Sequence, residues 1–398
     1  MKVQQWRLLA ICFVKGASTI RILTSVVLFA SACSVANAQD YSKVTPPQPK
    51  SALISSVIWD AHRFHKADGD TWPLTWAADN NLYGAAGDNQ DSPMNFWKIV
   101  NSENPDVWFP GSVYLVNNLP VDCKVYCQNV PGADPKAGIK PAGLVSIGGT
   151  LYFSVENMNY GENPAFNRQH NISGWIITSK DFGKTWDLHA TPQKFFSGRT
   201  ASAHFLNFGK DYADARDDFV YAYFPAADDG NSYWENNDYI LLGRVPKDKI
   251  LQRSAWEFYT GSDNSSQPRW DTDDKKAVEV FRYARMTGEN HVTYDKGLKR
   301  YLMGNYGFHD GHGNPRPYHT KWPETVCPSQ LTLYEAPEPW GPWSQFFKDD
   351  DFGRCGVYNP SFPAKFMSPD GLTMWMVYAG TWEDYNFTTQ KLTLVLAK

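Results

Sequence analysis

The sequence has few cysteines, little excess charge and no long apolar run beyond its first 38 residues, and each shortage excludes a class of protein. With 38 Lys and Arg against 42 Asp and Glu, the formal net charge is -4. The sequence has no block of Lys and Arg that could bind the phosphate backbone of a nucleic acid, so we expect no nucleic-acid partner. No later segment is apolar for the ~20 residues that a membrane span requires. The lack of a G-x-S-x-G elbow and of a glycine-rich phosphate loop argues against serine-hydrolase and nucleotide chemistry.

Residues 1–38 have the pattern of a cleaved secretory leader, with four positive charges, an apolar run over residues 22–32 and the small-residue site Ala36-Asn37-Ala38. Removal of this leader changes the net charge from -4 to -8, because the leader contains four Lys and Arg residues and no Asp or Glu. We expect a secreted or periplasmic protein with a linker at 39–54 and one domain at 55–398. A lipid anchor at Cys33 is a weaker alternative, because Ala30 stands where a lipoprotein signal has Leu.

Four cysteines remain beyond the leader, an even number that suits an oxidising compartment. We expect the disulfides Cys123–Cys127 and Cys327–Cys355, because each pair lies within one repeat of the chain, although three pairings are possible. A zinc site lacks the second short Cys/His pair that it needs.

Five segments share one pattern: an apolar strand, a tight polar turn, and a second strand that carries aromatic residues. They are residues 72–86, 141–155, 203–212 with 218–224, 290–304, and 362–378. The repeat of roughly 60 to 90 residues suits a propeller blade of four strands. The sequence therefore predicts an all-β fold, a five-bladed β-propeller with four-stranded antiparallel blades. The third unit fits least well, because residues 210–217 lengthen its turn.

The segment S-K-D-F-G-K-T-W at 179–186 resembles the Asp-box of sialidases and other propeller proteins. This resemblance implies a hairpin turn in which Ser179 and Asp181 bond the local backbone, Gly183 allows the tight turn and Trp186 packs inward. Such a turn joins the third and fourth strands of a blade on the face opposite the functional mouth. A sialidase itself is disfavoured, because five units are found and no triad of arginines is evident.

With this orientation, the mouth carries the residues before each innermost strand and those between the second and third strands. The first group is Asp68, Asp70, Lys140, residues 199–202, Glu289, His291, Asn359 and Ser361. The second group is Asp88, Asp91, Glu156, Arg168, His170, Asp228, Asp229, Glu235, His309, Asp310, His312, Trp382, Glu383 and Asp384. Carboxylates, imidazoles and tryptophans in such numbers indicate a carbohydrate site.

Several strings, among them G-D-T-W-P-L-T-W-A-A-D-N-N-L-Y-G-A-A-G-D and L-L-G-R-V-P-K-D-K-I, look like those of a bacterial family of secreted proteins. This family resembles the five-bladed propeller endo-D-arabinanases of glycoside hydrolase type, over most of residues 55–398. The resemblance implies a glycoside hydrolase that acts on an arabinan-like or marine-type glycan. In five-bladed hydrolases of arabinans and xylans, a catalytic Asp begins the first innermost strand, and Asp70 holds that position here as base or nucleophile.

Glycoside cleavage also requires a protonated carboxyl group whose environment raises its pKa. The candidates for this general acid are Glu235, which lies among aromatic residues in Y-W-E-N-N, and Glu289 before the fourth innermost strand. A turn-capping role remains the structural alternative for Asp70.

Substrate-binding candidates are the cationic and aromatic residues of the predicted mouth. They are Lys140, Arg168, His170, Arg199, His291, His309, Trp72 and Trp382. His204 and His291 lie on or beside innermost strands, where they either contact a central ion or water or are hydrogen-bonded core residues. No cofactor is expected, although structural calcium is possible at the acidic stretches 270–274 and 349–351. The loop with His309, Asp310 and His312 is a weaker metal candidate than a substrate-facing loop. The expected partner is a polysaccharide or oligosaccharide, bound by a monomer.

Two other functions stay open at this stage. A polysaccharide lyase would use His, Tyr, Arg or Lys of the mouth to remove a proton beside a uronate carboxylate. A glycan-binding module would bind without releasing sugar.

Overall fold

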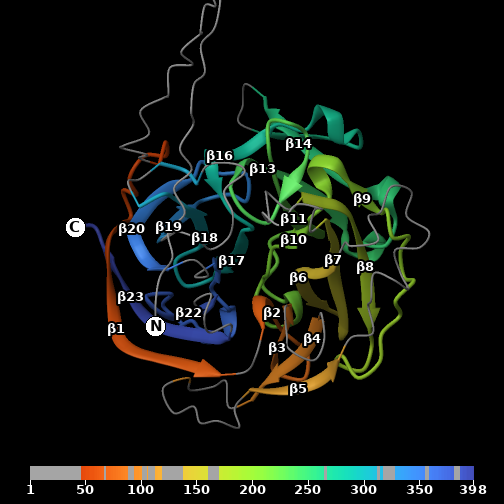
Figure 1. Cartoon of the computed structure of the whole chain (residues 1–398), viewed down its shortest axis with the longest axis horizontal. Helices are drawn as coiled ribbons and strands as arrows, with labels where there is room; N and C mark the ends of the chain where they lie inside the picture. The colour runs from red at the N-terminus through yellow and green to blue at the C-terminus, as the bar shows by residue number, and fades with distance from the viewer. Residues whose placement is uncertain are drawn as a thin grey trace, which may run out of the picture. The chain divides into compact units, whose positions relative to one another are not determined.

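The structure is a computed structural model that describes residues 46–66, 69–87, 94–100, 105, 113–118, 138–159, 170–263, 267–311, 314–316, 328–354, 358–380 and 386–398. Over these residues the strands β1 to β23 form five antiparallel sheets, and no α-helix occurs. The sheets are the blades of a five-bladed β-propeller, with β2, β6, β10 and β17 around the centre (Figure 1). The described part of the chain contains no helix long and apolar enough to cross a membrane.

The blades follow one another along the chain. Blade 1 consists of β2 (Asp70–Trp76), β3 (Leu82–Gly87), β4 (Met94–Ile99) and β5 (Val113–Asn118). Blade 2 consists of β6 (Gly138–Ile147), β7 (Thr150–Asn159), β8 (His170–Ser179), β9 (Phe196–Ser197) and β12 (Ser232–Tyr233). Blade 3 consists of β10 (His204–Phe205), β11 (Phe219–Ala226), β13 (Asn237–Pro246), β14 (Glu257–Ser262), β15 (Pro268–Asp271) and β16 (Glu279–Thr287).

Blades 4 and 5 have four strands each. Blade 4 consists of β17 (His291–Asp295), β18 (Arg300–Phe308), β19 (Pro328–Ala336) and β20 (Ser344–Arg354). Blade 5 consists of β21 (Tyr358–Ser361), β22 (Thr373–Ala379), β23 (Phe387–Leu396) and β1 (Ile54–Lys66). Within the described ranges, short 3-10 helices lie between strands at η2 (Gly198–Thr200), η3 (Lys210–Tyr212), η4 (Lys247–Lys249), η5 (Arg253–Ala255), η6 (Asp274–Lys276) and η7 (Ala364–Phe366).

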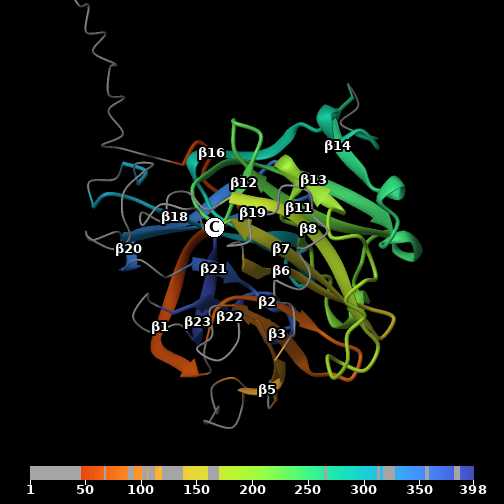
Figure 2. The same ribbon diagram turned by 45° about the vertical axis from the view of Figure 1, so that its right-hand side comes forward.

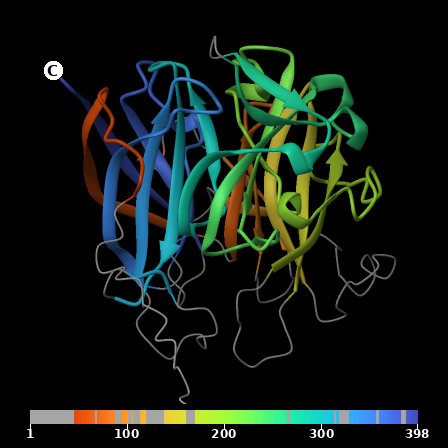
Figure 3. The same ribbon diagram turned by 90° about the horizontal axis from the view of Figure 1, so that it is seen from above.

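Blade 5 closes the ring with strands from both ends of the described chain. β1 pairs antiparallel with β23, from Ile54 opposite Leu396 to Lys66 opposite Phe387 (Figure 1). In Figure 2, β21 lies beside β2, which it contacts across the boundary between the last blade and the first. Seen from the edge in Figure 3, the strands of the blades run from one face of the ring towards the other.

The predicted fold class is confirmed, and four of the five sequence segments form the first hairpin of a blade. Two details differ from the expectation. Blades 2 and 3 have more than four strands. In blade 2, β12 comes from the β11–β13 connection and pairs with β8, and in blade 3, β15 pairs with β14 and β16 with β13. In the fifth unit the innermost strand β21 ends at Ser361, before the predicted segment begins at residue 362.

The turn after β8 has the local bonds that its sequence predicts. The Gly183 N–H donates to Ser179 Oγ over 2.8 Å, and the Thr185 N–H donates to Asp181 over 2.9 Å. The Trp186 ring packs against Phe96 of blade 1 and Phe153 of blade 2, with centroid distances of 5.0 and 5.6 Å. Because Ser179 pairs with Leu151 at the start of β7, this turn lies at the opposite end of the blade from Glu156.

The innermost strands approach one another closely near the axis. A Cβ on Gly143 of β6 would lie 2.4 Å from the Ala203 carbonyl oxygen, so only glycine permits this contact with the segment that enters β10. Register shifts occur in β2 between Thr71 and Leu74, in β6 after Pro141 and in β21 after Tyr358. Such bulges re-aim side chains where pairing is interrupted, and here they lie at the starts of the innermost strands.

Candidate active site

One face of the propeller carries a group of charged side chains around its axis, at the starts of the innermost strands. Asp70 begins β2, Lys140 lies near the start of β6, and His204 begins β10. Glu156 comes from the end of β7, and Glu289 lies two residues before β17. These five residues are called the mouth cluster. All of them are buried, with exposed fractions between 0 and 5%.

Asp70 is positioned by an unusual backbone. Thr71 and Trp72, which follow it, have left-handed φ angles of 72° and 57°. This conformation costs a β-branched or bulky residue on the order of 1–3 kcal/mol and is found where a side chain must be held in a fixed direction. The Tyr358 hydroxyl donates to Asp70 Oδ2 over 2.6 Å from the first residue of β21. Two blades therefore fix this carboxylate, and the hydroxyl stabilises its charged form.

Lys140 and Glu156 lie opposite one another in the β6–β7 ladder. Burial raises the pKa of Glu156 to about 7, while nearby Glu289, Ser202 and Lys140 oppose the rise. Neither carboxylate oxygen of Glu156 has a hydrogen bond of ordinary geometry to a described residue, although Glu289 and Ser202 are close enough to affect its pKa.

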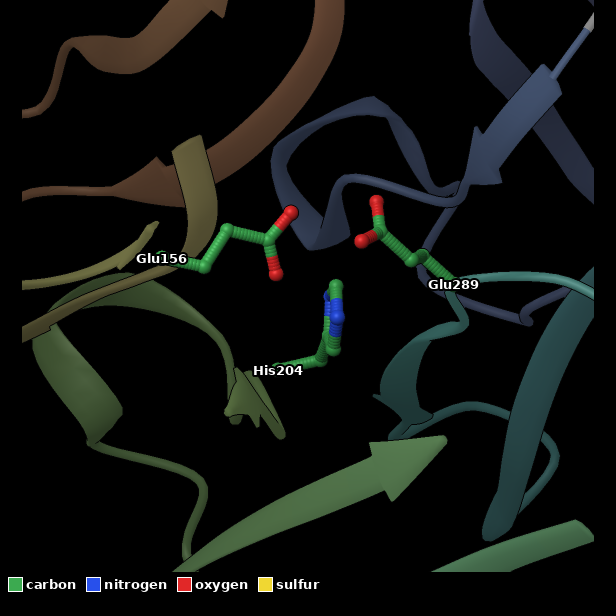
Figure 4. Close-up of side chains that lie close together, drawn as sticks. All are labelled: Glu156, His204 and Glu289. Carbon is green, nitrogen blue, oxygen red and sulfur yellow. The ribbon is translucent and has the colours of Figure 1, made fainter. Parts of the chain in front are cut away.

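Glu289 faces Glu156 across the axis, with the His204 ring between and below them (Figure 4). One ligand atom from each of these three residues lies within 4.8 Å of the others. Burial and the neighbouring Glu156 raise the pKa of Glu289 well above its ordinary value. Asn359 Nδ2 donates to Glu289 Oε2 over 3.3 Å, whereas Oε1 has no hydrogen-bond partner within the described ranges.

The two histidines near the axis are neutral at neutral pH. Burial, and then His291, holds the pKa of His204 well below its usual range. Burial lowers the pKa of His291 to about 4. The two rings meet edge to face with their centroids 5.2 Å apart. The mouth cluster thus combines three carboxyl groups with one ammonium group.

The segment that links β11 to β13 contacts three other blades. In this segment, residues 232–236, Tyr233 pairs with His170 of blade 2. Asn236 exchanges two hydrogen bonds with the backbone of Phe308 in blade 4, over 3.1 and 3.3 Å. Trp234 packs on Tyr358 of blade 5 at a centroid distance of 5.6 Å.

Among the described residues, Glu156, His204 and Glu289 form the only group of at least three His, Cys, Asp or Glu side chains that could hold a metal ion. Three carboxylates of the acidic stretches named for calcium form ion pairs. Asp271 pairs with Lys276 at 2.6 Å and Asp274 with Arg253 at 2.7 Å. Asp350 pairs with Lys348 at 2.9 Å.

Comparison of the sequence with protein families gives a match over residues 69–390, which begins directly before Asp70. The matching family is DUF4185, a domain of unknown function. The chain belongs to the DUF4185 family. No curated protein matches the chain by sequence.

The propeller of this DUF4185 protein is similar to several solved structures. A candidate hydrolase from Bacteroides ovatus has a TM-score of 0.50 and 12% identity, over 83% of this chain and 87% of that one. A GH43_1 enzyme from Xanthomonas citri has a TM-score of 0.44 and 11% identity, over 86% and 94% of the two chains. A glycosyl hydrolase from Bacteroides ovatus has a TM-score of 0.42 and 12% identity, over 87% and 93%. The likeness to the first of these, at a TM-score of 0.50 and 12% identity, supports the fold alone.

Of the three residues predicted to be catalytic, Asp70 and Glu289 belong to the mouth cluster of the DUF4185 protein. Glu235 lies in segment 232–236, and both of its oxygens accept hydrogen bonds from Arg316, over 3.1 and 3.2 Å. This buried ion pair favours an ionised Glu235, which suits a positioning role better than that of a proton donor.

Several predicted binding residues have other partners. Trp72 is fully buried, donates to the Gly69 carbonyl over 2.9 Å and leaves no face for a sugar, which corrects the expectation for it. Arg199 donates to the Asp274 and Ala277 carbonyls. Both ring nitrogens of His309 are engaged, by the Asp350 carbonyl at 2.6 Å and the Gly311 N–H at 3.2 Å.

The other residues predicted to bind substrate lie at the rim, near the axis or outside the described residues. His170 lies half-buried at the rim, where burial lowers its pKa and Asp229 opposes the shift. Lys140 and His291 line the axis. Arg168, Trp382 and the four cysteines of the predicted disulfides lie outside the described residues. The sequence indicates no catalytic role for Glu156, His204 or Tyr358, although Glu156 is expected at the mouth and Tyr358 adjoins Asn359 there.

Proposed function

We propose that the protein hydrolyses a glycosidic bond of a polysaccharide or oligosaccharide. The observation that carries the proposal is the convergence of Asp70, Glu156 and Glu289 at one end of the propeller axis. Glycoside hydrolysis needs one carboxyl group that is protonated and another that is ionised. Environments that push the pKa values of neighbouring carboxyl groups apart provide this pair.

The surroundings of the three carboxyl groups suggest their roles. Asp70 accepts the Tyr358 hydroxyl bond and acts as base or nucleophile. Glu289 acts as the general acid, because burial and Glu156 both favour its protonated form. Glu156 supports this role through its charge. The aromatic neighbours that favoured Glu235 as the acid are outweighed by the ion pair between Glu235 and Arg316.

The charge of the site favours a neutral sugar. A lyase would need cations to neutralise a uronate carboxylate. Arg199 is bound to backbone carbonyls, and Lys140 lies among three carboxyl groups. We further propose that the substrate is an arabinan-like glycan and that the protein is secreted or periplasmic. These proposals rest on the resemblance to endo-D-arabinanases and on the leader-like residues 1–38.

The test is a panel of neutral and uronate-containing glycans, assayed both for reducing ends and for ultraviolet absorbance. We expect reducing ends without absorbance. Asp70→Asn should lower the rate by about 10²- to 10⁴-fold. Tyr358→Phe should lower kcat by roughly 10- to 100-fold, because a hydrogen bond to a charged group contributes about 1.5–3 kcal/mol.

Asp248→Asn is the matched control, since Asp248 is exposed in η4 beyond the far end of β13. It should retain wild-type activity. Full activity in Asp70→Asn would refute the assignment of Asp70. Ultraviolet-absorbing products would establish a lyase, and glycan binding that survives Asp70→Asn without any product would establish a binding module.

A further inference from the structure

Glu156, His204 and Glu289 together offer a second chemistry that acid–base catalysis does not use. They come from β7, from β10 and from the residues before β17, so three different blades supply one ligand atom each. These atoms lie within 4.8 Å of one another, and the side chains are at most 1% exposed. Figure 4 shows the two carboxylates facing each other above the imidazole ring.

The donor atoms of this group have lone pairs available. Both oxygens of Glu156 and Oε1 of Glu289 have no hydrogen bond of ordinary geometry to the residues that the structure describes, although the two carboxyl groups are close enough to affect each other's pKa. Buried polar atoms of this kind cost free energy unless something binds them. The His204 Nε2 atom lies 2.7 Å from Ser202 Oγ. Such an outer contact fixes the orientation of a ligating histidine.

We infer that Glu156, His204 and Glu289 form a binding site for a divalent transition-metal cation of the Zn²⁺ type. Carboxylate oxygens and a neutral imidazole are the ligands that zinc and its neighbours accept in proteins. Three carboxyl groups of the mouth cluster face a single ammonium group, so an added cation also balances charge.

The inference does not depend on the proposed function. It does connect with it, because a carboxylate oxygen bound to a cation cannot deliver a proton to a glycosidic oxygen. Cation binding and the acid role of Glu289 therefore exclude one another, and zinc should inhibit hydrolysis over the concentration range in which it binds.

The test is titration calorimetry of the metal-stripped full chain with Zn²⁺, using the wild type, Glu156→Gln and His204→Gln. We expect one site per chain and at least a tenfold weaker affinity in each variant, because each loses one ligand. Asp248→Asn is the matched control and should bind as the wild type does, since Asp248 is exposed in η4 outside the group. Circular dichroism melting confirms that each variant is folded.

The outcomes separate the two proposals. Absence of stoichiometric zinc binding, or equal affinity in the wild type and in a folded Glu156→Gln variant, would overturn the metal site. Zinc binding that both variants weaken, in a protein without glycan hydrolysis, would support the metal site and count against the proposed function. Hydrolysis that continues at saturating zinc would overturn the assignment of Glu289 as the acid.

Discussion

Asp295 shows that burial of a carboxyl group is not confined to the mouth cluster. It ends β17, at the opposite end of this strand from His291, and is 1% exposed. Its Oδ1 atom accepts the Leu298 N–H over 3.0 Å, while Oδ2 has no partner within the described ranges. Burial raises the pKa of Asp295 to about 6, the backbone of Leu298 and Gly297 opposes this, and Asp370 adds to it.

This pKa shift predicts a pH-dependent contribution to stability. Because the folded state binds the proton more tightly than the unfolded state, the free energy of unfolding falls as pH rises from about 4 to about 6. Above that window the loss is complete, and it amounts to at most ~3 kcal/mol at about 1.4 kcal/mol per pKa unit. Asp295→Asn keeps an oxygen for the Leu298 N–H but has no proton to lose.

Urea unfolding at pH 4, 6 and 8 measures this effect. The stability of Asp295→Asn relative to the wild type should rise between pH 4 and 6 and stay constant from pH 6 to 8. Parallel pH dependence of the two proteins would show that Asp295 does not titrate in this window. Asp248→Asn, in which the replaced carboxyl group is exposed, should follow the wild type throughout.

For single residues, the sequence predicted their location in the fold better than the side chains that they contact. Asp70 and Glu289 were expected at the mouth because each lies at the head of an innermost strand, which is a property of local order. Glu235 and Arg316, which form an ion pair, are 81 positions apart in the sequence, and no local pattern predicts this contact. Trp72 was expected to bind sugar because of its type and place. Its burial arises from packing against Trp97 and Phe387, which only the closed ring brings together.

At the scale of the elements, the spacing of the innermost strands depends on a few glycines. Gly143 lies in β6, where a Cβ would meet the Ala203 carbonyl oxygen at 2.4 Å, the Phe205 nitrogen at 2.8 Å and the His204 Cα at 2.9 Å. All three are backbone atoms of the neighbouring blade, so a side chain here cannot be accommodated by a rotamer change. The position of His204 in the mouth cluster therefore depends on Gly143.

Gly143→Ala should push β6 and β10 apart and destabilise the protein by roughly 1–3 kcal/mol or more, as overpacking does. Gly148→Ala is the control: its φ of 57° carries a left-handed cost of about 1 kcal/mol, but no atom lies within 4 Å of the added Cβ. Thermal melting should show a larger loss for Gly143→Ala. Zinc affinity should fall in Gly143→Ala alone, and an equal loss in both variants would contradict the steric argument.

The hairpins of the blades could be predicted because each is local, with a strand, a turn and a strand in direct succession. The elements that the sequence did not predict are those whose partners are distant. β12 has two residues and pairs with β8 more than 60 residues earlier. β21 has only four residues, and its pairing with β22 is interrupted by a register shift between Tyr358 and Ser361. So short a strand leaves no pattern in the sequence that marks where it begins.

For the molecule as a whole, closure of the ring is the step that unites the blades. β1 supplies the outer strand of blade 5 and pairs with β23 along most of its length. Its Trp59 also packs on Phe347 and Phe352 of blade 4, with centroid distances of 5.2 and 5.9 Å. Without β1, the backbone of β23 would become an exposed sheet edge, which promotes aggregation.

A chain that begins at residue 69 should therefore melt at least about 10 °C below the full chain and aggregate on heating, because it loses the closing strand and its apolar contacts. A chain that begins at residue 46 keeps β1 and serves as the control, with a melting temperature near that of the full chain. Scanning calorimetry with light scattering measures both effects. If the chain from residue 69 melted as the control does, closure through β1 would contribute little, and the contacts of β21 with β2 would suffice to hold the ring together.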